Sequence, residues 1–133
     1  MKRHNLPAFS LTELLIALAI VGILVLIALP NLMPLISEAK GTEAKLQLKH
    51  LYTLEKRYFY MNSKYTNDLK ELGFESAKLV SAGGNANYII EVTEASAGTF
   101  KASAKAATDF DQDGEFNLWE IDQDQKLKEV TKD

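Results

Sequence analysis

The stretch FSLTELLIALAIVGILVLIALPNLMP, residues 9–34, decides the fold of this chain. Between Leu14 and Leu29 it carries no charged or strongly polar side chain. A helix that is apolar on every side does not suit the surface of a soluble domain, and roughly 20 apolar residues cross the core of a bilayer. The stretch therefore predicts a helix that lies in lipid or against other helices. One acid, Glu13, stands where the apolar run begins, and an unpaired carboxylate is costly there.

The composition of the whole chain excludes several classes of protein. The 133 residues include no Cys, so disulfides, thiol chemistry and thiolate metal sites are excluded. The formal net charge is −3, and an acidic domain is a poor electrostatic match for nucleic acid. The sequence shows no nucleophile with a matching base and no phosphate-binding loop. We therefore predict a protein that is not an enzyme.

The first eight residues form a short basic flank, MKRHNLPA, which the positive-inside rule keeps in the cytoplasm. A secretory signal peptide cleaved after Ser37-Glu38-Ala39 is one interpretation. The apolar run is longer than usual for that class, and Pro30 and Pro34 precede the cleavage site. A plain membrane anchor is a second interpretation, but it leaves Glu13 without a partner.

A third interpretation rests on a resemblance. Ala8-Phe9-Ser10-Leu11-Thr12-Glu13-Leu14-Leu15 resembles the type IV prepilin signal, which has a small residue, then Phe, and Glu as the fifth residue after the cut. The resemblance implies cleavage between Ala8 and Phe9 by the prepilin peptidase, followed by N-methylation of Phe9. It also implies that Glu13 pairs with the free amine of a neighbouring subunit during filament assembly. The sequence departs from the family at Ala8, where Gly is most usual, and at Thr12, where an aliphatic residue is common.

The resemblance implies a structural subunit of a homo-oligomeric helical filament. Its partners would be related pilins, the prepilin peptidase/methyltransferase and the inner-membrane assembly platform. The chain would first cross the bacterial inner membrane once with a cytoplasmic N-terminus, and then join a periplasmic or extracellular filament. Residues 1–8 would be the leader, 9–34 the transmembrane and assembly helix, and 35–133 the globular pilin domain. Two alternatives stay open: a pseudopilin of a type II secretion system, and a membrane-anchored calcium-binding module that never polymerises.

The helix is predicted to continue from Leu35 to about Met61 with two different faces, after a kink or local melting at Pro30 and Pro34. Residues at the 3.6-residue period form the apolar face: Ala44, Leu48, Leu51, Tyr52, Leu54, Tyr58, Phe59 and Met61. Polar residues lie mostly elsewhere: Lys40, Glu43, Lys45, Gln47, Lys49, Glu55 and Lys56. The apolar face therefore needs a sheet packed against it.

After a short helical turn at 66–73, capped by Asp68 with Glu71, the period of the sequence changes to two. The alternation predicts strands at 87–93, 99–105, 116–122 and 126–131. Short connections favour an antiparallel meander, and its apolar face needs the amphipathic helix as a cover. We therefore predict an α+β, pilin-like lollipop: a long N-terminal helix packed on a small antiparallel sheet of three to four strands.

The segment DFDQDGEFNLWE, residues 109–120, fits the calcium-loop pattern D-x-D-x-D-G-x5-E of EF-hands. The predicted ligands are the side chains of Asp109, Asp111, Asp113 and Glu120 and the carbonyl group of Glu115. The predicted flanking strands argue against a true EF-hand and favour a loop site at the three aspartates. The alternative is an ordinary turn rich in Asp and Gly, before a Trp-x-Ile-Asp strand that resembles the end of many pilins. No cofactor is required, and calcium is the one optional ligand.

Overall fold

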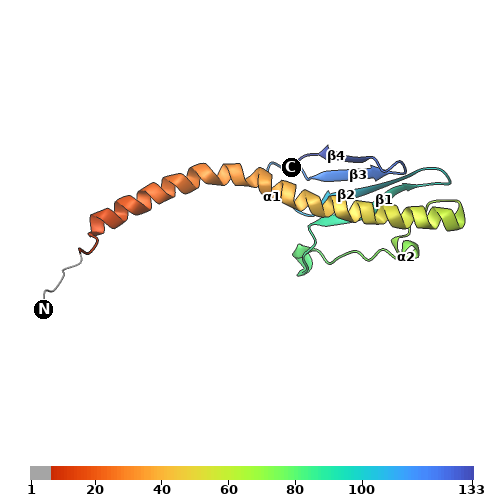
Figure 1. Cartoon of the computed structure of the whole chain (residues 1–133), viewed down its shortest axis with the longest axis horizontal. Coiled ribbons are helices and arrows are strands. Elements are labelled where there is room, and N and C mark those ends of the chain that lie inside the picture. Colours follow the sequence, from red (N-terminus) through yellow and green to blue (C-terminus); the bar gives the residue numbers. More distant parts are fainter. Residues whose placement is uncertain (1–6) are drawn as a thin grey trace. The chain divides into compact units, whose positions relative to one another are not determined.

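The computed structural model of the chain describes residues 7–133 (Figure 1). Residue contacts divide the chain into two units, Met1–Met33 and Pro34–Asp133. The elements in order are α1 (Leu11–Asn62), α2 (Leu69–Leu72), the 3-10 helix η1 (Val80–Ala82), β1 (Tyr88–Ala95), β2 (Phe100–Ala106), β3 (Leu118–Asp122) and β4 (Leu127–Thr131).

Helix α1 is continuous over 52 residues, and it passes through Pro30 and Pro34 without a break. The expected local melting at these prolines is therefore wrong. Each proline removes one backbone hydrogen bond, but the flanking residues are good helix formers, and an apolar stretch gains most by keeping its other backbone groups bonded within the helix. The helix ends at Asn62, and Ser63 follows it in the left-handed region at φ 55°.

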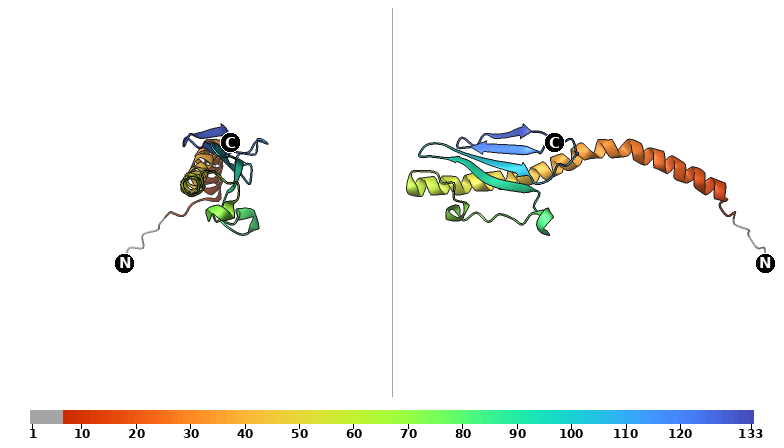
Figure 2. Two further views of the ribbon diagram at one scale, coloured as in Figure 1. Left: turned by 90° about the vertical axis from the view of Figure 1, so that its right-hand side faces the viewer. Right: turned by 180° about the vertical axis from the view of Figure 1, so that it is seen from behind.

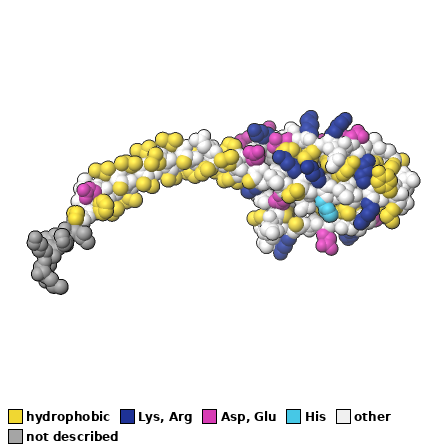
Figure 3. All heavy atoms as spheres, in the orientation of Figure 1, with side chains coloured by type: hydrophobic (Ala, Val, Ile, Leu, Met, Phe, Trp, Pro, Cys, Tyr) yellow, Lys and Arg dark blue, Asp and Glu magenta, His cyan; other side chains and the backbone are white. Residues whose placement is uncertain are grey.

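In the first unit, the side chains of α1 are exposed all round the helix. The large apolar residues from Leu11 to Met33 are between 41% and 75% exposed. The space-filling view shows hydrophobic side chains covering the visible face of this part of α1, and charged side chains gathered over the second unit (Figure 3). Within residues 7–133, α1 is the one helix long and apolar enough to cross a membrane by length and composition.

The second unit is a four-stranded antiparallel sheet packed on the second half of α1. The strand order is β1-β2-β3-β4, so every strand pairs with its neighbour in sequence. Two opposite views show this sheet lying along the second half of the helix (Figures 1 and 2). The predicted α+β class, with a long helix on an antiparallel sheet, is confirmed.

The core lies between α1 and one face of this sheet. Ala44, Leu48 and Leu51 are fully buried on the helix, as the helical period predicts. The strands bury the expected alternating residues: Tyr88, Ile90, Phe100, Ala102, Ala104 and Ile121. Two expectations for α1 are wrong. Met61 is 77% exposed in the last turn of the helix, and Glu55, placed on the polar side by sequence, is 0% exposed.

The connection between α1 and β1 contains the predicted short helix. Asp68 caps α2, because its carboxylate accepts a hydrogen bond from the Lys70 backbone N–H at 2.8 Å. Glu71 does not complete the predicted reciprocal cap. Its carboxylate instead accepts hydrogen bonds from the hydroxyls of Tyr58 and Thr66, each at 3.0 Å, and so ties α2 back to α1.

Candidate functional site

The first candidate site is the start of α1, where Ser10 and Glu13 cap the helix reciprocally. The Ser10 backbone N–H donates to Glu13 Oε2 at 2.7 Å, and the Glu13 backbone N–H donates to Ser10 Oγ at 3.2 Å. A helix leaves its first N–H groups without partners in the helix, and a Ser at the N-cap with a Glu three residues later satisfies two donors at once. Sequence analysis missed the role of Ser10, although the S-x-x-E spacing before an apolar run is its signal.

The residues of the predicted cut lie just before this cap. Ala8 and Phe9 are exposed and precede α1, and the Phe9 side chain is 87% exposed. A peptide bond outside regular secondary structure is accessible to a peptidase because no helix has to unwind first. The bond of the predicted cut, the amine that such a cut would create and the Glu13 carboxylate therefore lie within six consecutive residues.

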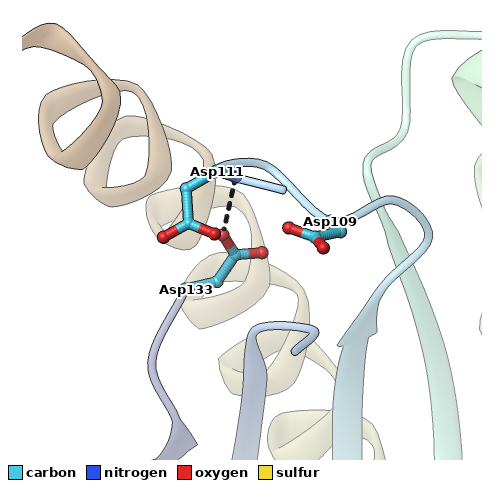
Figure 4. Close-up of side chains that lie close together, drawn as sticks. All are labelled: Asp109, Asp111 and Asp133. Carbon is cyan, nitrogen blue, oxygen red and sulfur yellow. Dashed lines mark hydrogen bonds between the residues drawn. The ribbon is translucent and has the colours of Figure 1, made fainter. Parts of the chain in front are cut away.

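The second candidate site is the acidic loop that precedes β3. One carboxylate oxygen from each of Asp109, Asp111 and Asp133 lies within 4.8 Å of the others (Figure 4). The first two residues belong to the loop, and Asp133 arrives from the segment after β4. Three hard carboxylate oxygens from two segments are the donor type that calcium prefers.

Backbone hydrogen bonds hold these carboxylates in place. The two oxygens of Asp109 accept from Gln112 N–H at 2.6 Å and Gly114 N–H at 2.7 Å. Those of Asp133 accept from Asp111 N–H at 3.0 Å and Phe110 N–H at 2.9 Å. Each oxygen keeps a further lone pair, so the donor set fits a divalent cation.

Desolvation and hydrogen bonding shift the pKa values of two loop carboxyls, Asp111 and Asp109, in opposite directions. Desolvation, with the neighbouring carboxylates of Asp113, Asp133 and Asp109, raises the pKa of Asp111. Desolvation also acts on Asp109, but backbone hydrogen bonds from Gly114 and Gln112 outweigh it and lower the pKa of that carboxyl.

The loop site differs from the ligand set that the EF-hand pattern predicts. Glu120 lies on β3, and its carboxylate faces Lys101 Nζ at 3.9 Å across the sheet. Asp113 is exposed and does not join the close group of carboxylates, while Glu115, predicted to bind through its carbonyl group, is also exposed. Asp113 Oδ1 instead accepts the Glu115 backbone N–H at 2.7 Å. A strand cannot return Glu120 to the loop as the second helix of an EF-hand would.

Asp133 was not predicted as a member of this site, because no local pattern links it to a loop more than twenty residues earlier. It is 8% exposed, and its main-chain oxygen accepts a hydrogen bond from Ser37 Oγ on α1. Asp133 therefore connects the acidic loop, the segment after β4 and α1 within the second unit.

Comparisons with known proteins bear on the N-terminal site. Residues 7–29 match the family model described as the prokaryotic N-terminal methylation motif. The chain is also 44% identical over 66 residues to the type IV major pilin protein PilA of Myxococcus xanthus (strain DK1622). This match covers 50% of the chain and 30% of the relative, so the chain spans less than a third of that pilin's length.

The matched motif contains the Ala8–Phe9 bond, Ser10 and Glu13, and the helix that it opens is exposed and apolar all round. The second half of that helix packs on an antiparallel sheet, which is the fold that the prepilin resemblance implies. By the methylation motif and the likeness over 66 residues to a major pilin, this chain is similar to type IV pilins, and the helix-on-sheet fold agrees with that likeness.

Proposed function

We propose that the chain is a structural subunit of a type IV pilus-type filament. The observation that carries this proposal is the methylation motif at the head of an apolar helix that the chain leaves uncovered. A simple anchor needs an apolar surface but no carboxylate at its start. A filament subunit needs both the apolar surface and the carboxylate. Its helix moves from lipid to pack against other helices, and the charged carboxylate at the start of the helix then requires a partner.

The proposed sequence of events begins in the bacterial inner membrane. The basic flank holds the N-terminus in the cytoplasm, and α1 crosses the bilayer. The prepilin peptidase cuts between Ala8 and Phe9, and methylation of the Phe9 amine follows. An assembly platform then moves the subunit from lipid into a filament with other pilins, on the far side of the membrane. The same apolar surface of α1 holds the subunit in the membrane before assembly and packs against other subunits in the filament. The chain itself catalyses none of these steps.

The mature N-terminus tests this proposal directly. We expect mass spectrometry of the chain from an assembling cell to find N-methylated Phe9 as the first residue, both in the membrane and in filaments sheared from the cells. A host without the prepilin peptidase is the control, and there Met1 should remain. Retention of Met1 in the assembling cell, or cleavage near Ala39, would overturn the proposal.

We also propose that the acidic loop binds calcium through Asp109, Asp111 and Asp133. Their separation of at most 4.8 Å supports a shared cation, which would relieve the mutual repulsion of the three carboxylates. A ligand present at a hundred times its Kd stabilises the folded state by about 2.7 kcal/mol. Weak extracellular calcium sites have Kd values of about 0.1–1 mM, so calcium at about 10 mM would nearly saturate such a site, and we expect it to raise the Tm by several degrees.

Two substitutions separate this loop site from an EF-hand. Asp111→Asn should abolish the rise in Tm, because it removes one of the three clustered carboxylates. Glu120→Gln should keep the rise, because Glu120 faces Lys101 on the sheet. Magnesium at the same concentration controls for general screening by a divalent cation. An unchanged Tm in calcium, or a response lost in Glu120→Gln and kept in Asp111→Asn, would contradict this ligand set.

A further inference from the structure

The sheet of the second unit has two edges that carry opposite charge. β1 and β4 are the edge strands, because the strand order is β1-β2-β3-β4. Residues 126–132, which include β4, contain three lysines and one acid, and we call them the basic edge. Residues 68–94, the connection before β1 and most of β1, contain five acids and two lysines, and we call them the acidic edge. Within residues 7–133 the one salt bridge joins Lys101 to Glu120, so neither edge neutralises its charge in that way.

Val130 gives the basic edge an exposed apolar side chain. The register between β3 and β4 shifts between Leu118 and Trp119, and Val130 is the extra residue of this β-bulge. Its side chain is 45% exposed. A bulge bends an edge strand and turns the side chain of the extra residue to a new direction. The basic edge therefore presents one apolar side chain between the exposed Lys128 and Lys132.

The acidic edge contains a cavity of about 250 Å³ between β1 and the connection that precedes it. Tyr88, Ile89 and Ile90 line this cavity from β1, and Ala77 and Leu79 line it from the connection. Two opposite views show the connection running along the β1 side of the sheet (Figures 1 and 2). Ile89 is 41% exposed and Ala77 is also exposed, so the cavity opens to the surface. The acidic edge therefore offers an apolar recess within a negatively charged surround.

We propose that the basic edge of one copy docks on the acidic edge of a neighbouring copy, with Val130 entering the recess beside Ile89. This inference rests on the proposed function and adds a contact between sheet domains to it. Two basic edges repel each other, as do two acidic edges, so the charges select a contact between unlike edges. A contact between two different patches of one chain is heterologous, and its repetition builds an open helical filament when the rotation does not close a ring.

A second copy of the chain suits both edges better than either edge suits itself. Lysines on an edge strand commonly prevent unwanted strand pairing. Here they act selectively, because a neighbour that presents Glu91 and Glu94 attracts them, whereas another basic edge repels them. Burial of Val130 in the recess supplies the apolar contact that fixes how the edges meet, since charges at a rim contribute more to selectivity than to affinity.

Charge reversal tests the contact without depending on which charged residues face each other. Lys126→Glu with Lys128→Glu makes both edges acidic. Glu91→Lys with Glu94→Lys makes both edges basic. The chain with all four changes again has unlike edges, with their charges exchanged. All four residues are exposed, so these substitutions leave the core between α1 and the sheet unchanged.

The measurement is the ratio of sheared filament to membrane-held subunit for each full-length variant, in a cell that assembles the wild-type chain. We expect reversal of either edge alone to lower this ratio at least about tenfold, because like charges then face each other at every repeat of the contact. The chain with all four changes should recover most of the lost filament. Val130→Ala should lower the ratio about threefold, because it removes two methyl groups from the recess.

The matched control is Lys49→Glu with Lys64→Glu, which changes the net charge as much as reversal of the basic edge does. Both lysines are exposed and lie outside the two edges, so this variant should assemble like the wild type. An immunoblot of the membrane-held subunit and mass spectrometry of the N-terminus at Phe9 check that each variant is made and processed normally.

The outcomes separate this inference from the proposed function. Wild-type ratios in both single-edge variants would leave the edges to a partner other than this chain, which overturns the contact while the proposed function stands. A chain with all four changes that assembles no better than the single-edge variants would also overturn it, because the charges would then not be complementary. Normal assembly of Val130→Ala would overturn the place of Val130 in the recess. Absence of filaments from the wild-type chain itself would instead overturn the proposed function.

Discussion

Replacing Glu13 by Ala is expected to abolish filament assembly while leaving the cut after Ala8 intact. The variant removes one partner of the proposed pair and leaves the ammonium of the neighbouring chain unpaired in an apolar surrounding. Removing one partner from a buried ion pair costs about 3–5 kcal/mol. That free energy corresponds to a loss of at least a hundredfold in the association constant of each added subunit. Because a filament repeats the contact at every step, such a loss prevents growth.

The measurement compares sheared filament with membrane-held subunit by immunoblot and electron microscopy. Glu38→Ala is the matched control, since Glu38 is an exposed acid on the same helix in the second unit. Glu13→Gln adds a finer comparison, because the amide oxygen still accepts the Ser10 N–H but carries no charge. We expect Glu13→Gln to fail as well. Filaments at the wild-type level in Glu13→Ala would contradict the pairing, and filaments in Glu13→Gln alone would show that capping matters more than charge.

Glu55→Gln is expected to stabilise the chain at pH 8 and to have little effect at pH 4. Glu55 is 0% exposed on α1, its Oε2 accepts only the Thr66 backbone N–H at 3.3 Å, and Oε1 has no partner among the described residues. Burial raises the pKa of this carboxyl from 4.5 to about 7, against the opposing effect of the Thr66 hydrogen bond. The folded state therefore holds the proton more tightly than the unfolded state.

The sign of the pH dependence follows from that difference. Below pH 4.5 the carboxyl is protonated in both states, so burial of the charge costs nothing. Between pH 4.5 and about pH 7 the unfolded state loses the proton first, and the free energy of unfolding falls as pH rises. A shift of this size corresponds to about 3 kcal/mol, at about 1.4 kcal/mol per pKa unit. Gln carries no titrating proton, so this fall should be missing in the variant.

Denaturant unfolding of the full chain in detergent micelles, measured from pH 4 to pH 8, tests the prediction. The free-energy difference between wild type and Glu55→Gln should grow by up to about 3 kcal/mol over this range. Glu75→Gln, a change at an exposed carboxyl before β1, is the control and should show no such trend. A constant difference between wild type and Glu55→Gln would show that Glu55 is not buried in its charged form at neutral pH.

Glu55 and Asp133 show where prediction from the sequence ends. The 3.6-residue period identified the buried face of α1 correctly at Ala44, Leu48 and Leu51, but it assigned Glu55 to solvent because a carboxylate is rarely buried. The segment after α1 packs over Glu55, and the Thr66 backbone N–H donates a hydrogen bond to the Glu55 carboxylate. The two residues are eleven positions apart, so the helical period does not predict their contact. Likewise, the pattern of Asp109 and Asp111 is visible in the sequence, whereas Asp133 joins them only after β4 has paired with β3.

The sequence by itself determined the features that depend on short spacing. These are the prepilin-like motif around Glu13, the apolar segment, the helix that becomes amphipathic after it, and the four antiparallel strands. Each follows from neighbours within a few residues, where backbone period and side-chain chemistry act directly. The tertiary structure alone decided that Glu55 is buried, that Glu120 faces Lys101, and that Asp133 completes the acidic site. The physical reason is that burial and ligand geometry depend on segments that are distant in sequence and are brought together by packing. A local sequence pattern does not predict which of these segments will be in contact.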